Sequence, residues 1–335
     1  MAHRVGRYTV ILDSKPKIIS SAAAVGTKEG DGPMAQYFDY ISDDDLMESK
    51  SWEQAESLFQ RTAVQIALKK ARISACEIDG IFAGDLLNQC IGSTFGLIGF
   101  EIPLTGLYGA CSTMSLSLIT SATAVDSGAM RKAVAVTSSH FCSAERQFRF
   151  PLDYGGVRPP TSQWTVTGSG AAIISQSGSG PHIEAYTLGR AVDYSISDAN
   201  NMGAAMAPAA ADTISRFFSD TGTKPADYDF IVTGDLGAVG SRLLHELLAA
   251  DGIDVSGVHR DCGVMMFDPS RQDVHAGGSG CGCSASIFCS YFMQRLNEGS
   301  INNMLLCATG ALMSPTSSQQ GQSIPGICHL LHIKQ

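Results

Sequence analysis

The chain has 335 residues, of which 44% are hydrophobic and 16% charged, so it can bury a large core and is long enough for two domain-sized units. Its formal net charge of -9 comes from acidic residues scattered along the chain, which gives no basic face and argues against binding of nucleic acid. Ten cysteines at irregular intervals, without CxxC pairs, favour reduced thiols in a cytosol-like compartment over a disulfide framework.

The N-terminal sequence MAHRVGRYTVILDSKPK contains no apolar segment of signal-peptide length, so we expect no export signal there. Downstream, the acidic run Asp43-Asp44-Asp45 precedes a segment, 51–72, whose apolar side chains have helical spacing. We interpret the run as charge at a helix start, because the ligand spacing of an EF-hand calcium loop is absent.

An internal repeat is visible after this segment. The sequence CEIDGIFAGDL at 76–86 aligns with ADYDFIVTGDL at 226–236, and a helix-like segment precedes each copy, at 51–72 and at 204–221. A glycine turn, an uncharged helix, a second glycine and a buried strand follow each copy. Helices that alternate with apolar strands predict parallel strands joined by helical crossovers, and therefore an α/β fold.

The repeat divides the chain into two halves, 1–178 and 179–335, related by a pseudo-twofold axis. The uncharged stretches 102–125 and 276–294 are long enough to be tested as membrane spans. Both are rich in Ser, Thr, Gly and Cys instead of Leu, Ile and Val. We therefore expect two buried helices of a globular protein, packed against each other at its centre.

The first uncharged helix follows the turn GACST, which places Cys111 at the first turn of the helix. Unpaired backbone N–H groups and the positive end of the helix dipole favour negative charge there, so the pKa of this thiol is predicted to be lowered. Such a cysteine is a candidate nucleophile, and the same N–H groups are able to hold an oxyanion or a carboxylate. A small buried hydrophobic residue remains the alternative.

Further candidates for the same pocket follow the strand expected at 133–138. His140 ends this strand and is either a polar ligand contact or a core histidine with satisfied hydrogen bonds. Arg146 and Arg149, in AERQFRF, are able to hold a carboxylate, with exposed or dimer-contact arginines as the alternative. Thr167, in TVTGSG, lines the pocket or belongs to a simple tight turn.

The second half contributes two more candidates. Asp235 follows the strand expected at 230–233, and Cys281 lies in GGSGCGCSAS at the head of the second uncharged helix. His245 and His259 are expected to be surface groups.

The sequence predicts no cofactor and no metal ion. Cys281-x-Cys283 has no further ligands at a convincing spacing, and packing at a helix turn explains it. The glycine patterns lack the Lys-Ser/Thr of a phosphate loop and the fingerprint of a dinucleotide site, so nucleotide binding is disfavoured.

The turn GACST, the duplicated α/β half and GGSGCGCSAS resemble the thiolase superfamily, which includes the condensing enzymes of fatty-acid and polyketide synthesis. A set of motifs within 28–316 resembles more narrowly the family of stage V sporulation protein AD: KEGDGP, KSWEQAE, AGDLLNQ, YGACST, TSSH, AERQFRFP, DYGG, TVTGSGA, MGAAMAPAAADTI, GGSGC and ATGALMSPT. The resemblance covers nearly the whole chain. It implies a thiolase-like fold, with duplicated βαβαβ halves in a layered αβαβα sandwich around two buried central helices.

The superfamily's catalytic pattern is a Cys nucleophile assisted by a His from the second half and by an Asn or another His. Cys111 matches the nucleophile. Where the resemblance places the histidine, after 230–233, the sequence has Gly234-Asp235, and where it places the asparagine it has Gly280-Cys281. General-base assistance contributes about 10²–10⁴ in rate, so its loss predicts a protein that is not an enzyme.

The narrower resemblance implies binding of pyridine-2,6-dicarboxylic acid (dipicolinic acid), free or as its calcium chelate, for uptake into the developing spore. Its partners would be membrane proteins of the same sporulation operon and a second copy of the chain, at the inner membrane of the forespore or spore. A flat aromatic dianion needs N–H or cationic groups for its carboxylates and an apolar slot for its ring. The predicted ligand-binding residues are Cys111, His140, Arg149, Thr167, Asp235 and Cys281.

Two other classes of function remain open. An acyltransferase or condensing enzyme of the ketoacyl synthase type would carry the acyl group on Cys111 and use His140 as the base. A structural scaffold would have a vestigial pocket and act only through its protein partners.

Overall fold

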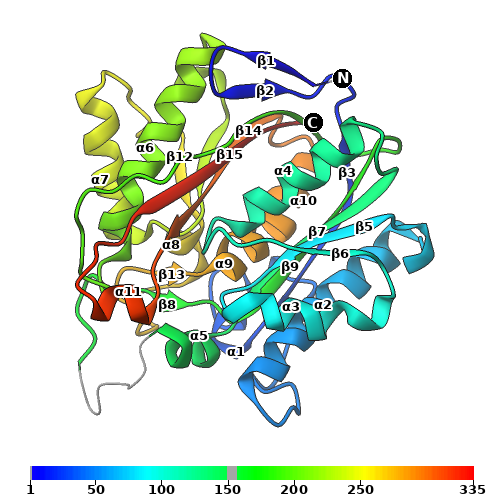
Figure 1. Ribbon diagram of the computed structural model, residues 1–335, viewed down its shortest axis with the longest axis horizontal. Coiled ribbons are helices and arrows are strands. Elements are labelled where there is room, and N and C mark those ends of the chain that lie inside the picture. The colour runs from blue at the N-terminus through cyan, green and yellow to red at the C-terminus, as the bar shows by residue number, and fades with distance from the viewer. Residues whose placement is uncertain (1, 149–156) are drawn as a thin grey trace.

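The structure, a computed structural model, describes residues 2–148 and 157–335. The chain folds into layers of helices, sheet, central helices, sheet and helices (Figure 1). The predicted α/β sandwich with two buried central helices is therefore confirmed.

The first half contains the secondary structure up to Ser175. Its strands are β1 (His3–Val5), β2 (Thr9–Ile11), β3 (Lys17–Val25), β4 (Tyr40–Ile41), β5 (Gly80–Gly84), β6 (Leu104–Gly106), β7 (Lys132–Ser139), β8 (Trp164–Thr165) and β9 (Gly168–Ser175). Its helices are α1 (Thr27–Gly30), η1 (Ala35–Tyr37), α2 (Trp52–Ala71), η2 (Ala75–Glu77), η3 (Asn88–Cys90), α3 (Ile91–Leu97), η4 (Ile98–Phe100), α4 (Thr113–Asp126) and α5 (Phe141–Phe148).

The second half begins with the strand at His182. Its strands are β10 (His182–Thr187), β11 (Phe230–Thr233), β12 (His259–Asp261), β13 (Gly278–Ser279), β14 (Asn303–Ala311) and β15 (Gly326–Lys334). Its helices are α6 (Met202–Thr221), η5 (Pro225–Asp227), α7 (Gly237–Ala250), α8 (Cys262–Met266), α9 (Cys281–Ile287), the π-helical turn η6 (Phe288–Phe292), α10 (Met293–Asn297) and α11 (Pro315–Gln319).

The strand order repeats between the halves. The order is β12-β11-β14-β15-β10 in one half and β3-β9-β7-β5-β6 in the other. Read outward from the junction of β10 and β3, corresponding strands therefore follow in the same order in both halves. The neighbours of β5 and of β11 are parallel to them, whereas β9 and β15 are antiparallel to both of their sheet neighbours. At the junction β10 and β3 are paired only through His182 and Lys17.

Local hydrogen bonds support the repeat in detail. Oδ2 of Asp79 accepts from the backbone N–H groups of Arg131 and Lys132, at the start of β7. Oδ2 of the aligned Asp229 accepts from the backbone N–H groups of Asn302 and Asn303, at the start of β14. The repeat seen in the sequence therefore marks equivalent elements of the fold.

The two central helices lie between the sheets. Helix α4 packs on β5 and β7 and also contacts β14, while α9 packs on β7 and β9. At Gly170, in β9, a Cβ would collide with the carbonyl oxygen of Ala285, so glycine is required where α9 crosses this strand. The poor helix formers of these segments are thus held by tertiary packing.

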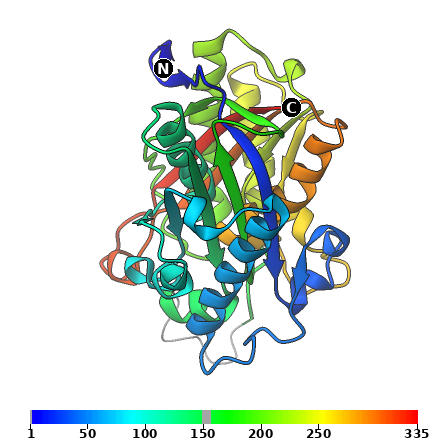
Figure 2. The same cartoon turned by 90° about the vertical axis from the view of Figure 1, so that its right-hand side faces the viewer.

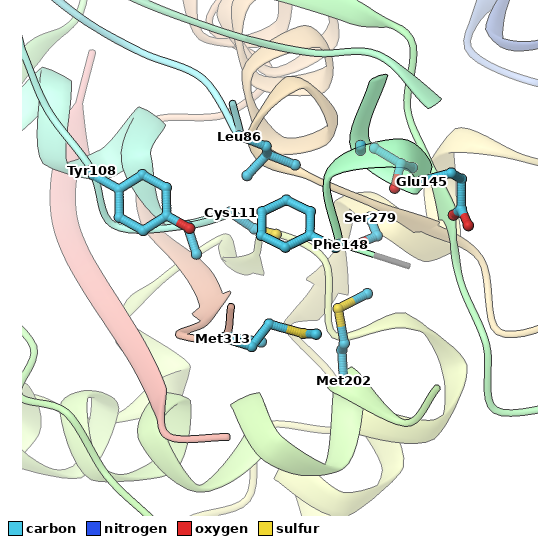
Figure 3. Close-up of a pocket in the computed structure, with 12 residues that line it drawn as sticks. Leu86, Tyr108, Cys111, Glu145, Phe148, Met202, Ser279 and Met313 are labelled. Atoms are coloured by element: carbon cyan, nitrogen blue, oxygen red, sulfur yellow. The ribbon is translucent and has the colours of Figure 1, made fainter. Parts of the chain in front are cut away.

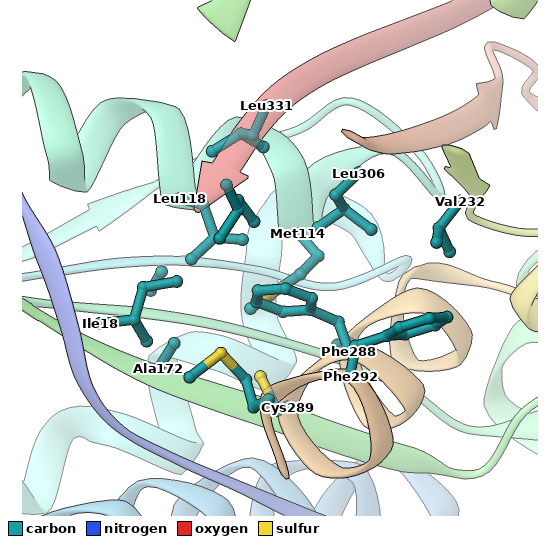
Figure 4. Close-up of a cluster of buried hydrophobic side chains, with 14 of the residues drawn as sticks. Ile18, Met114, Leu118, Ala172, Val232, Phe288, Cys289, Phe292, Leu306 and Leu331 are labelled. Atoms are coloured by element: carbon teal, nitrogen blue, oxygen red, sulfur yellow. The ribbon is translucent and has the colours of Figure 1, made fainter. Parts of the chain in front are cut away.

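The main hydrophobic core fills the space around these helices (Figure 4). Met114 and Leu118 of α4 contact the cluster that includes Phe288, Leu306 and Leu331. Helix α2 covers the outer face of β3 and β9 (Figure 2), and α6 covers β14 and β15. In residues 2–148 and 157–335, no helix combines the length and apolar character needed to cross a membrane.

The acidic run does not begin a helix, contrary to the prediction. Helix α2 begins at Trp52, and the N-cap is Ser51, whose side chain accepts a hydrogen bond from Gln54 N. Asp45 instead accepts hydrogen bonds from the backbone and side chain of Thr27. The run therefore stabilises the loop before the helix.

Candidate functional site

A small cavity lies at the head of α4, where segments of both halves meet (Figure 3). Its volume is about 40 Å³, room for about two or three water molecules. It is lined by Leu86, Tyr108, Ala110, Cys111, Ala144, Glu145, Phe148, Thr165, Met202, Ser279, Ala311 and Met313. The lining is mainly apolar, as expected for a site that takes a small organic molecule.

Cys111 lies in a tight turn just before α4. Ala110 has the left-handed φ of 50°, and the turn is fixed by hydrogen bonds from Ser112 Oγ to Gly109 O (2.6 Å) and from Thr113 Oγ1 to Ala110 O (2.6 Å). A Cβ at Gly310 would lie 2.5 Å from Gly109 O, so glycine lets β14 press against this turn. The turn thus holds the thiol at the cavity wall, where the side chain is only 6% exposed.

The pKa of Cys111 is shifted in the direction opposite to the prediction. Burial raises it well above its ordinary value, and the charge of Asp235 and a hydrogen bond to that carboxyl raise it further. Because α4 begins at Thr113 and its N-cap is Ser112, the thiol precedes the helix. The expected activation by the helix terminus is therefore wrong, and the thiol stays protonated at neutral pH.

Asp235 is a fully buried carboxyl directly beside Cys111. Its Oδ2 accepts hydrogen bonds from Gly280 N (2.8 Å) and Ser279 Oγ (3.2 Å), and its Oδ1 accepts from Thr309 Oγ1 (2.8 Å). Burial raises the pKa of Asp235 to about 6 despite these donors and the thiol. The Gly280 N–H is thus already occupied by a protein carboxylate, and it is not free to hold an oxyanion.

Cys281 is the first residue of α9, the second central helix. Its thiol donates a hydrogen bond to Ser138 O (2.9 Å), and the side chain packs with Cys111, Leu86 and Ala144. Burial raises its pKa, as do the neighbouring Cys111 and the carboxyls of the first half. Cys281 therefore supports the cavity from behind and is absent from its described lining.

His140 is held away from the cavity, and its predicted role there is corrected. Its Nδ1 accepts a hydrogen bond from Cys142 N (3.2 Å), so its Nε2 donates to Asp45 O (2.9 Å). Burial lowers its pKa. Both ring nitrogens make hydrogen bonds within the protein. His140 is therefore a core histidine with satisfied hydrogen bonds, which was the alternative interpretation.

The remaining candidates are also placed differently from the prediction. Thr167 donates its backbone N–H to Glu29 Oε1 (3.0 Å) and accepts from Phe141 N (3.1 Å), whereas Thr165 lines the cavity. Arg146 pairs with Glu53. Arg149 lies outside the described residues.

Sequence reasoning missed most of the apolar wall. Tyr108 and Met313 belong to the motifs YGACST and ATGALMSPT, so these motifs were the available signal. Phe148 and Met202 come from the end of α5 and the start of α6, and no local pattern connects them with Cys111.

The described surroundings of the cavity are acidic. Glu145 is the one charged side chain in the lining, as far as the structure describes it, and Asp235 lies directly behind Cys111. The charge of Asp235 disfavours a bare dianion next to Cys111, whereas a neutral ligand or a neutral chelate avoids this repulsion.

His259 also departs from the prediction, because it is buried in β12. His245 lies on α7 and is partly exposed.

Comparisons with known proteins agree with this architecture. The family model described as Stage V sporulation protein AD matches residues 6–334. Stage V sporulation protein AD of Bacillus subtilis (strain 168) is 44% identical over 324 residues, which cover 97% of this chain and 96% of that protein.

Two solved enzymes share the fold at low sequence identity. The 3-oxoacyl-[acyl-carrier-protein] synthase III from Aquifex aeolicus VF5 superimposes with a TM-score of 0.59 and 11% identity, covering 96% of this chain and 100% of that one. Human mitochondrial 3-ketoacyl-CoA thiolase in complex with CoA gives 0.62 and 11%, covering 97% and 99%. These likenesses confirm the predicted thiolase-like fold.

Proposed function

Because the chain belongs to the stage V sporulation protein AD family, whose role is in sporulation, we propose that it binds dipicolinic acid in the cavity beside Cys111. The protein serves uptake of this ligand into the developing spore, together with membrane proteins of the same operon, and does so at the inner membrane of the forespore. It does not turn the ligand over.

The observation that carries the binding role is the carboxyl of Asp235 against the thiol of Cys111. A condensing enzyme needs a thiolate and a group that takes up its proton. Here the group beside the thiol is a carboxyl whose negative charge raises the pKa of the thiol, so it suppresses ionisation of Cys111 instead of promoting it. The cavity therefore keeps its shape without the means to acylate its cysteine.

The ligand form best suited to this cavity is the neutral calcium chelate. The negative charge of Asp235 beside Cys111 disfavours a free dianion, while the chelate carries no net charge. The cavity is smaller than the ligand, so binding requires lining side chains to move. Phe148, Met202 and Met313 are suited to this, because methionine adapts easily and Phe148 ends its helix.

Filling the cavity is expected to abolish binding. In Ala144→Leu, three added carbon atoms occupy the space beside Cys111, so the affinity for calcium dipicolinate falls at least tenfold in calorimetry, about 1.4 kcal/mol. Ala129→Leu, at an exposed position, is the control and binds as the wild type does. Unchanged binding by a folded Ala144→Leu protein would place the ligand elsewhere.

The same preparations separate the binding role from the enzymatic one. After incubation with acyl-CoA, mass spectrometry is expected to find no acyl group on Cys111. A stable adduct with turnover would favour the condensing enzyme, and binding of neither compound would favour a scaffold.

A second copy of the chain is the proposed partner at the outer edge of β6. This strand pairs with β5 on one side and ends the sheet on the other, and its three residues are exposed. Phe95 and Ile98 next to it are 61% and 66% exposed, and Tyr108, which lines the cavity, is 48% exposed. Strand edges and apolar patches of this kind favour symmetric association.

Negatively charged side chains introduced at this surface are expected to dissociate the proposed dimer. Light scattering should give a dimer mass for the wild type and a monomer mass for the variant Phe95→Asp/Ile98→Asp. Val264→Asp, at another exposed apolar residue, serves as the control and remains dimeric. A wild-type monomer, or a dimeric double variant, contradicts the proposed interface.

A further inference from the structure

A continuous chain of hydrogen bonds leads from the surface of α7 to a buried carboxyl. Nε2 of His245 lies 3.0 Å from Nδ1 of His259, and Nε2 of His259 lies 2.8 Å from Oγ1 of Thr233. Oγ1 of Thr233 lies 2.6 Å from Oδ2 of Asp261. His245 is partly exposed, whereas the other three residues are buried.

Asp261 holds the segment that follows Asp235. Its Oδ2 accepts from Leu236 N (2.9 Å), and its Oδ1 accepts from Gly237 N (2.9 Å) and Val264 N (3.1 Å). The carboxyl therefore fixes the starts of α7 and α8. Its protonation state bears directly on the backbone that carries Asp235.

Each link of the chain is able to donate in either direction, because a hydroxyl and an imidazole each hold a proton and a lone pair. With Asp261 ionised, His245 donates to His259, His259 donates through Nε2 to Thr233, and Thr233 donates to Asp261. With Asp261 protonated, all three hydrogen bonds reverse, and His259 carries its proton on Nδ1. The two arrangements differ by one proton.

We propose that His245, His259 and Thr233 form a proton relay that connects solvent with the buried carboxyl of Asp261. One proton binds to Nδ1 of His245, and the proton on its Nε2 passes to Nδ1 of His259. The proton on Nε2 of His259 passes to Thr233, and that of the hydroxyl passes to Asp261. After the transfer, His259 and Thr233 are again neutral.

The charges around the four linked residues disfavour a positively charged His259, so a proton is passed on by this residue and is not held there. Arg260 donates from Nη1 to the His259 carbonyl and, with His245, disfavours an imidazolium there. Burial is the largest cause, and together these lower the pKa of His259 to about 3. Burial raises the pKa of Asp261 to about 7, and Asp235 contributes to this. At the outer end, the charge of Asp254 interacts with His245.

The tautomer of His259 tests the relay without any ligand. In protein labelled with ¹⁵N-histidine, long-range NMR spectra between about pH 5 and about pH 9 should show His259 changing from Nε2–H to Nδ1–H as the pH falls. Carboxyl ¹³C shifts should show Asp261 taking up its proton over the same range. A single His259 tautomer throughout would overturn the relay.

Two variants interrupt the chain at different points. Thr233→Val keeps the branched shape and removes the hydroxyl, so the change of tautomer should be lost while the circular dichroism spectrum is retained. His245→Phe should hold His259 as Nε2–H over the whole range. Glu246→Gln, an exposed neighbour on α7, is the control and should keep the change. A tautomer change that persists in Thr233→Val or His245→Phe would also overturn the proposal.

Discussion

Replacing Glu29 with glutamine is expected to flatten the fall in protein stability as the pH rises towards 8. Glu29 is 1% exposed, and burial raises its pKa to about 8, even though the backbone N–H of Thr167 donates to it. The folded state thus binds a proton that the unfolded state has lost. The stability from this proton is complete below the unfolded pKa of 4.5 and is lost as the pH rises towards 8.

The expected effect is large because one pKa unit corresponds to about 1.4 kcal/mol. Between about pH 6 and about pH 9, this group alone should lower the free energy of unfolding of the wild type by about 2–3 kcal/mol. Urea unfolding of wild type and Glu29→Gln at the two pH values measures the difference. Glu246→Gln, at an exposed site, should follow the wild type, and equal slopes for Glu29→Gln and wild type would refute the assignment.

Replacing Asp235 with asparagine is expected to increase the reactivity of the Cys111 thiol. The amide keeps the shape of the side chain but removes the negative charge, which is the largest cause after burial of the raised pKa. Because thiolate is the reactive form and the loss of the charge lowers the pKa of Cys111, alkylation of Cys111 by iodoacetamide should become roughly tenfold faster. Burial persists, so the rate should stay below that of the exposed Cys76.

The first half provides the matched control for this experiment. Asp85 is the aligned residue, but its Oδ2 accepts from the backbone and side chain of Ser93, so Asp85→Asn should leave the Cys111 rate unchanged. Peptide mapping by mass spectrometry gives the rate at each cysteine. If Cys111 is alkylated at the same rate in Asp235→Asn as in the wild type, burial alone accounts for the low reactivity of the thiol.

The sequence predicted the fold well, because its repeat marks elements whose formation depends on local pattern. The aligned copies contain β5 and β11, and the apolar spacing before them located α2 and α6. Glycines and small side chains identified the two central helices as buried.

The chemistry of the site was less predictable, because it depends on contacts between distant segments. The turn before α4 was found, but the effect of Asp235 on Cys111 comes from a carboxyl 124 residues away. The same holds for His140, whose position after β7 was expected to face the cavity. Its ring instead bonds to the loop at Asp45, and no periodicity encodes that choice.

The strand pairing between the two halves has a mechanical consequence for the cavity. Besides the contact of β10 with β3, strand β2 of the first half pairs with β10, and β8 of the first half pairs with β13. The two halves are therefore joined by these strand pairs as well as by the packing of α4 and α9 on their neighbouring strands. Residues of both halves form the cavity wall, with Leu86 from the first half and Met202 from the second. Thr165 and Ser279 also line the cavity and are paired with each other across β8 and β13, so a shift between the halves that widened the cavity would have to break this pair.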